Sequence, residues 1–275
     1  MIHKDSSSSS DDTPGRLSEF VSLLPSRGRY TFTRDEAKAA LRLSDSAVMS
    51  SLLRLQNARQ IAQPRRGFFV VIPPEYAPSG APPANWYIDD LMRFEKLPYY
   101  VALFSAAAIH GAAHQQAQEF QVMTTNPLRF SECGRNRIHF FVKSQLKKTQ
   151  TLTINTPTGT IRVATPETTA LDLIRYGLVR YDLGLVTTLI SELAEKIDPK
   201  RLYEAAKIEK DLPSAQRIGY LLEATEHTNI TELLYQLINK KKPRRIPLHP
   251  RLSLRNTKTN DRWRLNINTK IEIET

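Results

Sequence analysis

Hydrophobic residues near the start of the chain recur at helical spacing in three successive segments, 16–24, 34–41 and 45–58. Pro25 and Gly28 end the first segment, because proline and glycine interrupt helices. The side chains predicted to turn inward are Leu17, Phe20, Val21 and Leu24, then Ala37, Ala40 and Leu41, then Val48, Ser51, Leu52 and Leu55. The spacing therefore predicts three short helices that share one small apolar core.

Polar residues mark where the second and third helices begin. Thr33 followed three residues later by Glu36 is the pattern of a capping box, in which each side chain binds the backbone amide of the other residue. Ser44 stands at the N-cap position of the third helix, where a hydroxyl accepts from an otherwise unpaired amide. Both helix starts are thus encoded locally.

A β-hairpin is predicted directly after the third helix. Two β-rich stretches, 60–63 and 68–72, flank Pro64-Arg65-Arg66-Gly67, which places two arginines at the tip. A short extended segment, 30–32, precedes the second helix. Helices and hairpin in this order indicate a winged helix-turn-helix, whose third helix has the width of the major groove of DNA.

The outer face of the third helix and the hairpin tip supply the candidate DNA contacts. Serines allow close approach to bases or phosphates, and the arginines would lie against the backbone or enter the minor groove. The candidates are Ser44, Ser46, Met49, Ser50, Arg54, Arg65 and Arg66. Three alternatives stay open. Modules of this kind also bind proteins, and Arg54 is also placed to form a structural salt bridge. Met49 and Leu53 could instead belong to a dimer or domain interface.

The rest of the chain predicts a larger α+β domain. We expect a disordered leader at 1–14, the winged helix at 15–76, a stiff proline-rich linker at 77–84 within the extended stretch 73–84, and the larger domain at 85–275. Its expected helices span 87–96, 99–113, 166–176, 183–193, 199–207, 215–224 and 231–237, and its expected strands span 120–124, 137–142, 151–155, 160–164 and 263–273.

Composition narrows the class of protein. A chain of 275 residues with 40% hydrophobic residues is long enough for two domains with real cores. No stretch approaches the roughly 20 apolar residues of a membrane span, and no secretory signal is recognisable, so we expect a cytoplasmic protein without membrane contact. The single cysteine, Cys133, excludes an internal disulfide and is expected to be an ordinary reduced thiol.

Positive charge is concentrated toward the C-terminus. The formal net charge is +11, and residues 239–275 carry 11 Lys and Arg against 3 Asp and Glu. A patch of this kind extends a nucleic-acid footprint or meets an acidic partner, although a solvated loop is the equally simple reading. The candidate patch residues are Arg129, Arg135, Arg137, Lys143, Lys147, Lys148, Lys240, Lys241, Lys242, Arg244 and Arg245.

Residues suited to catalysis are present but do not assemble into a recognisable site. His110 and His114 have the i, i+4 spacing of a metal pair, yet no glutamate lies between them, and helix-end polar residues are the simpler interpretation. Asp89, Asp90 and Glu167 fit first-turn carboxylates of helices, and Asp172 is placed to pair with Arg175 or Arg162. The sequence therefore predicts no enzyme, no metal and no cofactor.

A series of motifs resembles the AbiEi-type antitoxins of type IV toxin–antitoxin systems. These are RRGFFVVIPPEY at 65–76, NWYIDDLM at 85–92, YYVALFSAAAIHGAAHQQAQEFQVMT at 99–124, ATPETTALDLIRY at 164–176, PLHP at 247–250 and RWRLNIN at 262–268. One departure is Arg59, where such a helix end usually has a glycine in the left-handed conformation.

The resemblance implies two activities that the residue patterns alone do not. The winged helix would bind inverted repeats in the promoter of its own operon, as double-stranded DNA, and repress transcription. The C-terminal domain would counteract a cognate nucleotidyltransferase-like toxin, directly or indirectly, in abortive infection that defends against phage.

Overall fold

The chain divides into two compact units. The computed structural model describes residues 16–41, 44–112, 119–255 and 257–271, so the expected leader at 1–14 lies outside the described residues. The first unit comprises the residues up to Phe94 together with Ser131–Asn136, and the second comprises Glu95–Phe130 and the residues from Arg137 onward. Helices and strands are mixed in both, which confirms the α+β class with an N-terminal helix–strand region and a larger C-terminal domain.

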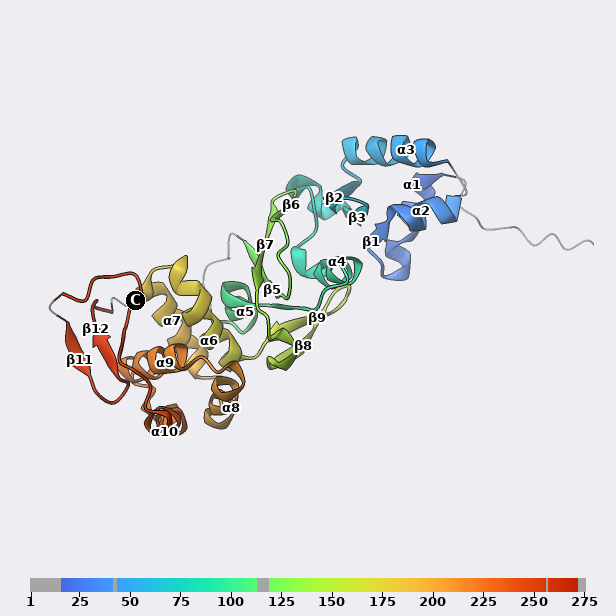
Figure 1. Cartoon of the computed structure of the whole chain (residues 1–275). Coiled ribbons are helices and arrows are strands. Elements are labelled where there is room, and N and C mark those ends of the chain that lie inside the picture. Colours follow the sequence, from blue (N-terminus) through green and yellow to red (C-terminus); the bar gives the residue numbers. More distant parts are fainter. Residues whose placement is uncertain (1–15, 42–43, 113–118, 256, 272–275) are drawn as a thin grey trace, which may run out of the picture. The chain divides into compact units, whose positions relative to one another are not determined.

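The first unit has the element order of a winged helix. A small antiparallel sheet of three strands, in the order β1-β3-β2, packs with three helices, and Figure 1 shows α3 along the outside of this unit. The helices are α1 (Leu17–Leu23), α2 (Arg34–Leu41), α3 (Asp45–Asn57) and α4 (Ile88–Phe94), with the 3-10 helices η1 (Pro25–Arg27), η2 (Pro74–Ser79) and η3 (Ala84–Trp86). The strands are β1 (Thr31–Thr33), β2 (Ile61–Arg65), β3 (Phe68–Val71) and β6 (Ser131–Cys133).

One apolar core joins the helices of the winged helix to its hairpin. Val48, Leu52 and Leu55 on the inner face of α3 are buried together with Phe69 and Val71 of β3. Leu17, Val21, Leu24, Phe32, Ala37, Leu41 and Ile61 complete this core, and Phe20 packs against it. The helical spacing therefore predicted the inward positions, apart from Phe20, Ala40 and Ser51, which are only partly buried.

Both predicted helix caps are confirmed. The Thr33 amide donates to Glu36 Oε2 (2.7 Å) and the Glu36 amide donates to Thr33 Oγ1 (3.1 Å), which is the complete capping box. Ser44 Oγ accepts from the Ala47 amide (3.3 Å) at the start of α3. Beyond the end of α3, Arg59 adopts φ 53°, the left-handed conformation that glycine usually supplies.

The first unit extends past the boundary expected at residue 76. Residues 73–84 are not an extended connector, because η2 and η3 form there and Trp86 packs edge-on against both Tyr30 and Tyr76. Gly134 lies so close to the backbone of Ser79 that an added Cβ would overlap it. Residues 73–84 are therefore packed structure and not a linker, because tertiary contacts that the local sequence does not show hold them in place.

The second unit contains two sheets and a group of helices. Its larger sheet has the strand order β7-β5-β4-β9-β8, its smaller one β10-β12-β11, and Figure 1 shows α6, α7 and α9 between the two. The helices are α5 (Leu103–Ile109), α6 (Pro166–Tyr176), α7 (Leu183–Ala194), α8 (Pro199–Glu209), α9 (Leu212–Ala224) and α10 (Glu232–Lys241), with 3-10 helices η4 (Leu146–Lys148), η5 (Gly177–Val179) and η6 (Thr228–Ile230). The strands are β4 (Tyr99–Val101), β5 (Phe120–Thr124), β7 (Asn136–Val142), β8 (Thr151–Thr156), β9 (Gly159–Ala164), β10 (Ile246–Pro247), β11 (Lys258–Asn260) and β12 (Leu265–Ile267).

Most elements predicted for this unit are confirmed, with two exceptions. The segment expected as one helix over 99–113 begins as strand β4, because Tyr99, Tyr100 and Val101 pair with β5 on one side and Val101 pairs with β9 on the other. The long strand expected over 263–273 is reduced to β12, and residues 272–275 lie outside the described part of the chain. Alternating side chains predicted extended structure there, but the pairing partners β10 and β11 are themselves short.

The RWRLNIN segment near the C-terminus is anchored on α9. Trp263 is fully buried and its indole Nε1 donates to Glu223 Oε2 (2.7 Å). The indole ring covers Gly219 so closely that a Cβ at that position would overlap it. Arg262 stacks over Tyr235 (3.9 Å to the ring centroid) and pairs with Glu223 and Glu232. This motif is therefore structural.

We expect Gly219→Ala to destabilise the second unit by about 1–3 kcal/mol, because the new methyl group displaces the Trp263 ring. Gly177→Ala is the matched control: its Cβ would meet only ordinary contacts with Leu173 and Tyr181, and the change should stay within about 0.5 kcal/mol. Urea unfolding followed by tryptophan fluorescence measures both. Equal midpoints for the two variants would contradict the packing of Trp263 on α9.

The capping box generates a prediction about pH. Burial raises the pKa of Glu36, but the hydrogen bonds from Arg29 and from the Thr33 amide outweigh it and lower the pKa below the ordinary value of 4.5. The resulting stabilisation is present above pH 4.5 and is lost as the pH falls through the lowered pKa. Glu36→Ala should lower the free energy of unfolding by about 1 kcal/mol at pH 7. Glu36→Gln keeps a side-chain oxygen that accepts from the Thr33 amide, so it should lower the free energy of unfolding by less.

Urea unfolding followed by circular dichroism at pH 7 and at pH 3 checks this. The gap between wild type and Glu36→Gln should be smaller at the lower pH, because a larger share of the carboxylate is protonated there. A gap of the same size at both pH values would show that the carboxylate charge does not stabilise α2.

Candidate nucleic-acid interface

The outer face of α3 carries exposed side chains opposite a fully packed inner face. Ser46, Met49, Ser50 and Arg54 are exposed, as predicted from the helical period. Leu53 is also exposed, at 58%, and Met49 is exposed at 48%. These side chains contribute nothing to the core, so the surface they form is available to a partner.

Three of the candidate residues at the N-cap of α3 and along it have local hydrogen bonds. Ser44 Oγ caps the helix and lies 3.1 Å from Ser46 Oγ, so its cap role is structural. Arg54 Nη2 donates to Ser51 Oγ (3.0 Å). Within the described residues no carboxylate lies at ion-pair distance from Arg54, which removes the salt-bridge alternative for that side chain in this structure.

The hairpin differs in detail from the predicted wing. Arg66 and Gly67 alone form its two-residue turn, whereas Arg65 belongs to β2, pairs in register with Phe68 and is half-buried. Gly67 adopts φ 83°, which a side chain rarely tolerates. The expectation of two equivalent arginines at the tip is therefore wrong, because the strand continues one residue further; Arg66 is the exposed one.

The hairpin is also braced on one side by other parts of the first unit. Phe68 packs against Phe94 of α4 with ring centroids 5.4 Å apart, and Ser131 Oγ of β6 donates to the Pro64 carbonyl (2.7 Å). The Arg34 amide donates to the Gly67 carbonyl (2.9 Å) at the turn itself. This hairpin is held rigidly, unlike a free-standing loop.

Not all residues of the predicted basic patch are exposed. Arg129, Arg135, Arg137, Lys147 and Lys148 are exposed, but the side chain of Lys143 is 3% exposed. Its ammonium lies 3.0 Å from Asp172 Oδ1 and 2.6 Å from Glu209 Oε1. The assignment of Lys143 to a surface patch is wrong, and so is the pairing expected for Asp172 with Arg175 or Arg162, since a charge this deeply buried takes the nearest buried counter-charge.

Tyr100 completes this buried network. Its hydroxyl donates to Asp172 Oδ2 (2.8 Å) and accepts from Lys143 Nζ (3.1 Å). Burial raises the pKa of Asp172 although Lys143 acts in the opposite direction, and burial beside Asp172 raises the pKa of Tyr100 well above its ordinary range. The network is buried, and its polar groups form hydrogen bonds and ion pairs with one another.

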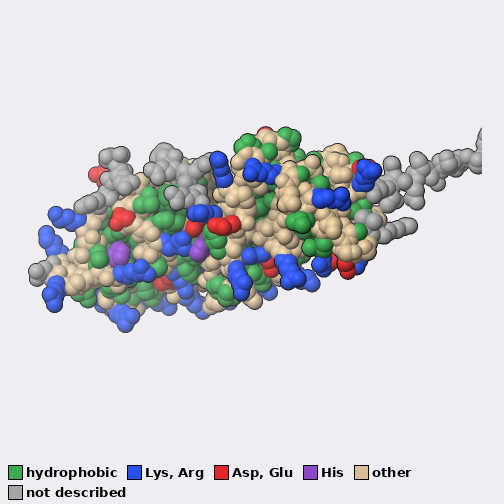
Figure 2. Space-filling model, turned by 90° about the horizontal axis from the view of Figure 1, so that it is seen from above, with side chains coloured by type: hydrophobic (Ala, Val, Ile, Leu, Met, Phe, Trp, Pro, Cys, Tyr) green, Lys and Arg blue, Asp and Glu red, His purple; other side chains and the backbone are tan. Residues whose placement is uncertain are grey.

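The C-terminal basic segment is exposed, although one of its arginines also binds other parts of the segment. Lys240, Lys241, Lys242, Arg244 and Arg245 are all exposed after or near the end of α10. Arg245 is used structurally, because it donates to the carbonyls of Asn260 and Leu265 and pairs with Asp261. Figure 2 shows many more Lys and Arg than Asp and Glu side chains on the face it presents.

The histidine, aspartate and cysteine side chains singled out in the sequence have structural roles where they are described. His110 ends α5 and its Nε2 lies 2.7 Å from the Ala164 carbonyl oxygen, while His114 lies outside the described residues. Asp89 and Asp90 open α4 and both pair with Arg93. Burial raises the pKa of the Cys133 thiol to about 12, which keeps it protonated.

Glu167 is a first-turn carboxylate as predicted, yet it is fully buried, and its Oε1 accepts from the Asp198 amide (3.0 Å). Among the described residues, no three His, Cys, Asp or Glu side chains gather as a metal site would require. Nor does any helix in the described ranges have the length and apolar character to cross a membrane.

Sequence reasoning did not single out Arg16, which precedes α1. In the structure it lines a pocket together with Ser50, Ser51 and Arg54 of α3. Nothing in the sequence around Arg16 signals this, because the two segments are some thirty residues apart and meet only through packing of α1 on α3.

Comparison with known proteins agrees with this architecture. Residues 100–224, which include α5 to α9, match the model of the AbiEi antitoxin C-terminal domain. The match makes this segment of the chain similar to the C-terminal domain of AbiEi antitoxins. The crystal structure of the RV2827C protein from Mycobacterium tuberculosis is similar, with a TM-score of 0.65, 14% identity, and coverage of 92% of this chain and 94% of that one. At that identity the likeness establishes the fold alone; no curated protein matches the chain by sequence.

Replacing Lys143 with Ala should destabilise the second unit by about 3–5 kcal/mol, because it leaves two buried carboxylates without their cation. Lys147→Ala, at an exposed position four residues away, should change the stability by less than about 0.5 kcal/mol. Urea unfolding followed by circular dichroism compares them. If both variants unfold like the wild type, the buried network does not exist.

Proposed function

We propose that this protein is the antitoxin and transcriptional autorepressor of a type IV toxin–antitoxin operon. It binds inverted repeats in its own promoter through the winged helix and counteracts a nucleotidyltransferase-like toxin through its C-terminal domain. The AbiEi domain match supports the antitoxin role, and the winged-helix arrangement of the first unit supports the DNA-binding role.

The outer face of α3 carries this proposal. A helix of this diameter fits the major groove, and small polar side chains at Ser46 and Ser50 let its backbone approach the base edges. Arg54 adds a cation on the same helix. Because Val48, Leu52 and Leu55 are buried, the helix is presented in one fixed orientation.

Electrostatics favour the same partner. The protein carries a net charge of +11, and Arg66 stands exposed at the turn of a braced hairpin, where it reaches a phosphate or the minor groove. The exposed cations at 129–148 and at 240–244 add a long-range attraction toward polyanions that carries no sequence information. They speed association and leave base selection to α3.

A second candidate function is protein docking without DNA. Met49 and Leu53 lie one helical turn apart on α3 and are 48% and 58% exposed, an apolar pair that suits a protein surface. A nucleotidyltransferase-like gene beside this one favours the first function. Capture of a partner protein without any promoter binding favours the second.

Arg66→Ala should weaken binding to duplex DNA of any sequence and lower the slope of log affinity against log salt by about one, because one phosphate contact is lost. Ser46→Ala and Ser50→Ala should instead change sequence preference, by about 1–3 kcal/mol per lost base contact. Fluorescence anisotropy with a duplex from the region upstream of the gene, at several salt concentrations, measures both effects.

Lys200→Ala, an exposed cation on α8, is the control and should bind like the wild type. Arg65 is left unchanged, because it is half-buried and its loss would mix folding with binding. Wild-type protein that binds no upstream duplex would refute the repressor function, and Arg66→Ala binding like Lys200→Ala would refute the role of the hairpin.

A further inference from the structure

A polar pocket opens where the start of α1 meets the middle of α3. Its volume is about 740 Å³. The lining residues are Arg16, Leu17 and Ser18 from α1 and its preceding residue, and Ala47, Ser50, Ser51, Arg54 and Leu55 from α3. Two arginines and three serines thus surround one hollow, and no carboxylate is among the described residues that line it.

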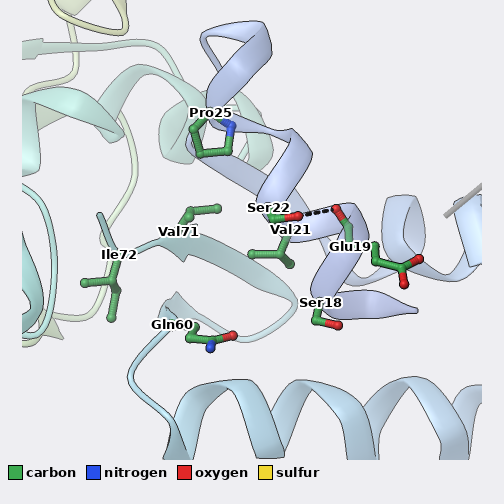
Figure 3. Close-up of a pocket in the computed structure, with 8 residues that line it drawn as sticks. All are labelled: Ser18, Glu19, Val21, Ser22, Pro25, Gln60, Val71 and Ile72. Atoms are coloured by element: carbon green, nitrogen blue, oxygen red, sulfur yellow. Dashed lines mark hydrogen bonds between the residues drawn. The ribbon is translucent and has the colours of Figure 1, made fainter. Parts of the chain in front are cut away.

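The neighbouring pocket on the other side of α1 shows what an ordinary surface hollow in this unit looks like. Figure 3 shows Val21 and Pro25 of the α1–η1 segment facing Val71 and Ile72 around a space of about 430 Å³. There the Ser22 hydroxyl donates to the Glu19 carbonyl (2.9 Å), so its proton is already used. Glu19 adds a carboxylate, and none of the described residues that line that pocket is an arginine. Among the described lining residues, the arginines belong to the pocket that faces α3.

The two arginines of the first pocket have no counter-charge among the residues that the structure describes. Other cations of this unit do: Arg29 pairs with Glu36 (2.8 Å), and Lys38 pairs with Asp45 (3.0 Å). Within the described residues neither Arg16 nor Arg54 lies at ion-pair distance from a carboxylate. Ser51 Oγ accepts from Arg54 Nη2, which holds that guanidinium at the rim and leaves its other donors unused.

We infer that this pocket binds one phosphate of the DNA backbone, held by Arg16 and Arg54. Guanidinium groups bind phosphate oxygens with two parallel hydrogen bonds, and two of them neutralise more charge than one. The inference rests on the DNA-binding function proposed above and deepens it. It assigns Arg54 to the backbone and not to a base, and it brings α1 into the interface.

Such a seat fixes the position of α3 in the groove. A phosphate contact carries no sequence information, but it sets the register and orientation of the helix. Arg16 stands at the N-cap of α1 and Arg54 lies on α3, so the contact joins two helices that share one core. Ser46 and Ser50 then meet the bases at a constant depth.

The test uses the full-length protein with two duplexes, one carrying the inverted repeat upstream of the gene and one with the same bases scrambled. Arg16→Gln and Arg54→Gln should each weaken binding to both duplexes by the same factor, about tenfold, as for one charge-assisted hydrogen bond. Each should lower the salt slope by about one. Arg27→Gln, an exposed arginine of η1 outside the pocket, is the control and should bind like the wild type.

A double variant tests whether the two arginines hold the same phosphate. If they do, Arg16→Gln/Arg54→Gln should lose less than the product of the two single losses, because the remaining arginine in each single variant already binds poorly. Full multiplicativity would place them on separate phosphates and overturn the shared seat. Circular dichroism confirms that all variants are folded.

The outcomes separate this inference from the proposed function. Wild-type binding combined with Arg16→Gln behaving like Arg27→Gln overturns the seat alone. A changed ratio of affinities between the two duplexes for Arg54→Gln makes that residue a base reader and also overturns it. Absence of wild-type binding to either duplex overturns the DNA-binding function itself.

Discussion

Burial of the inner face of α3 is the constraint on which the rest of the first unit depends. Val48, Leu52 and Leu55 meet Ile61, Phe69 and Val71 in a single core, and burial of each such side chain is worth about 1.5–3 kcal/mol. An α-helix that buries one face in this way exposes the opposite one. The outward residues of α3 therefore have no packing role, and their chemistry is free to serve a partner.

The hairpin owes its rigidity to contacts outside the winged helix proper. Phe94 packs against Phe68, and Ser131 donates a hydrogen bond to the Pro64 carbonyl. A rigid hairpin loses less conformational entropy on binding than a mobile loop. Arg66 is thus presented in a fixed place, although the hairpin exposes one arginine at its turn and not two.

The second unit is organised around α6, which contacts α5, α7, α8 and α9 and is buried along most of its length. The Lys143 ammonium reaches Asp172 of this helix and Glu209 of α8, so one buried cation ties a strand end to two helices. Removing one member of such a network destabilises the protein strongly, because a buried charge is left unpaired. Replacing the whole network by apolar residues of the same volume changes the stability much less. The basic character of the segment around Lys143 is therefore partly internal architecture, and only its exposed members bear on binding.

Local patterns along the chain were enough to locate most helices and strands, the capping box at Thr33 and the outward face of α3. Each of these depends on interactions between residues a few positions apart, which the sequence displays directly. Tertiary packing alone decided that Tyr99–Val101 is a strand, that the supposed linker is part of the first unit and that Lys143 is buried. It also decided that Arg16 shares a pocket with Arg54. In each case the residue or strand that makes the decisive contact lies far away in the chain, so neither periodicity nor composition predicts that contact.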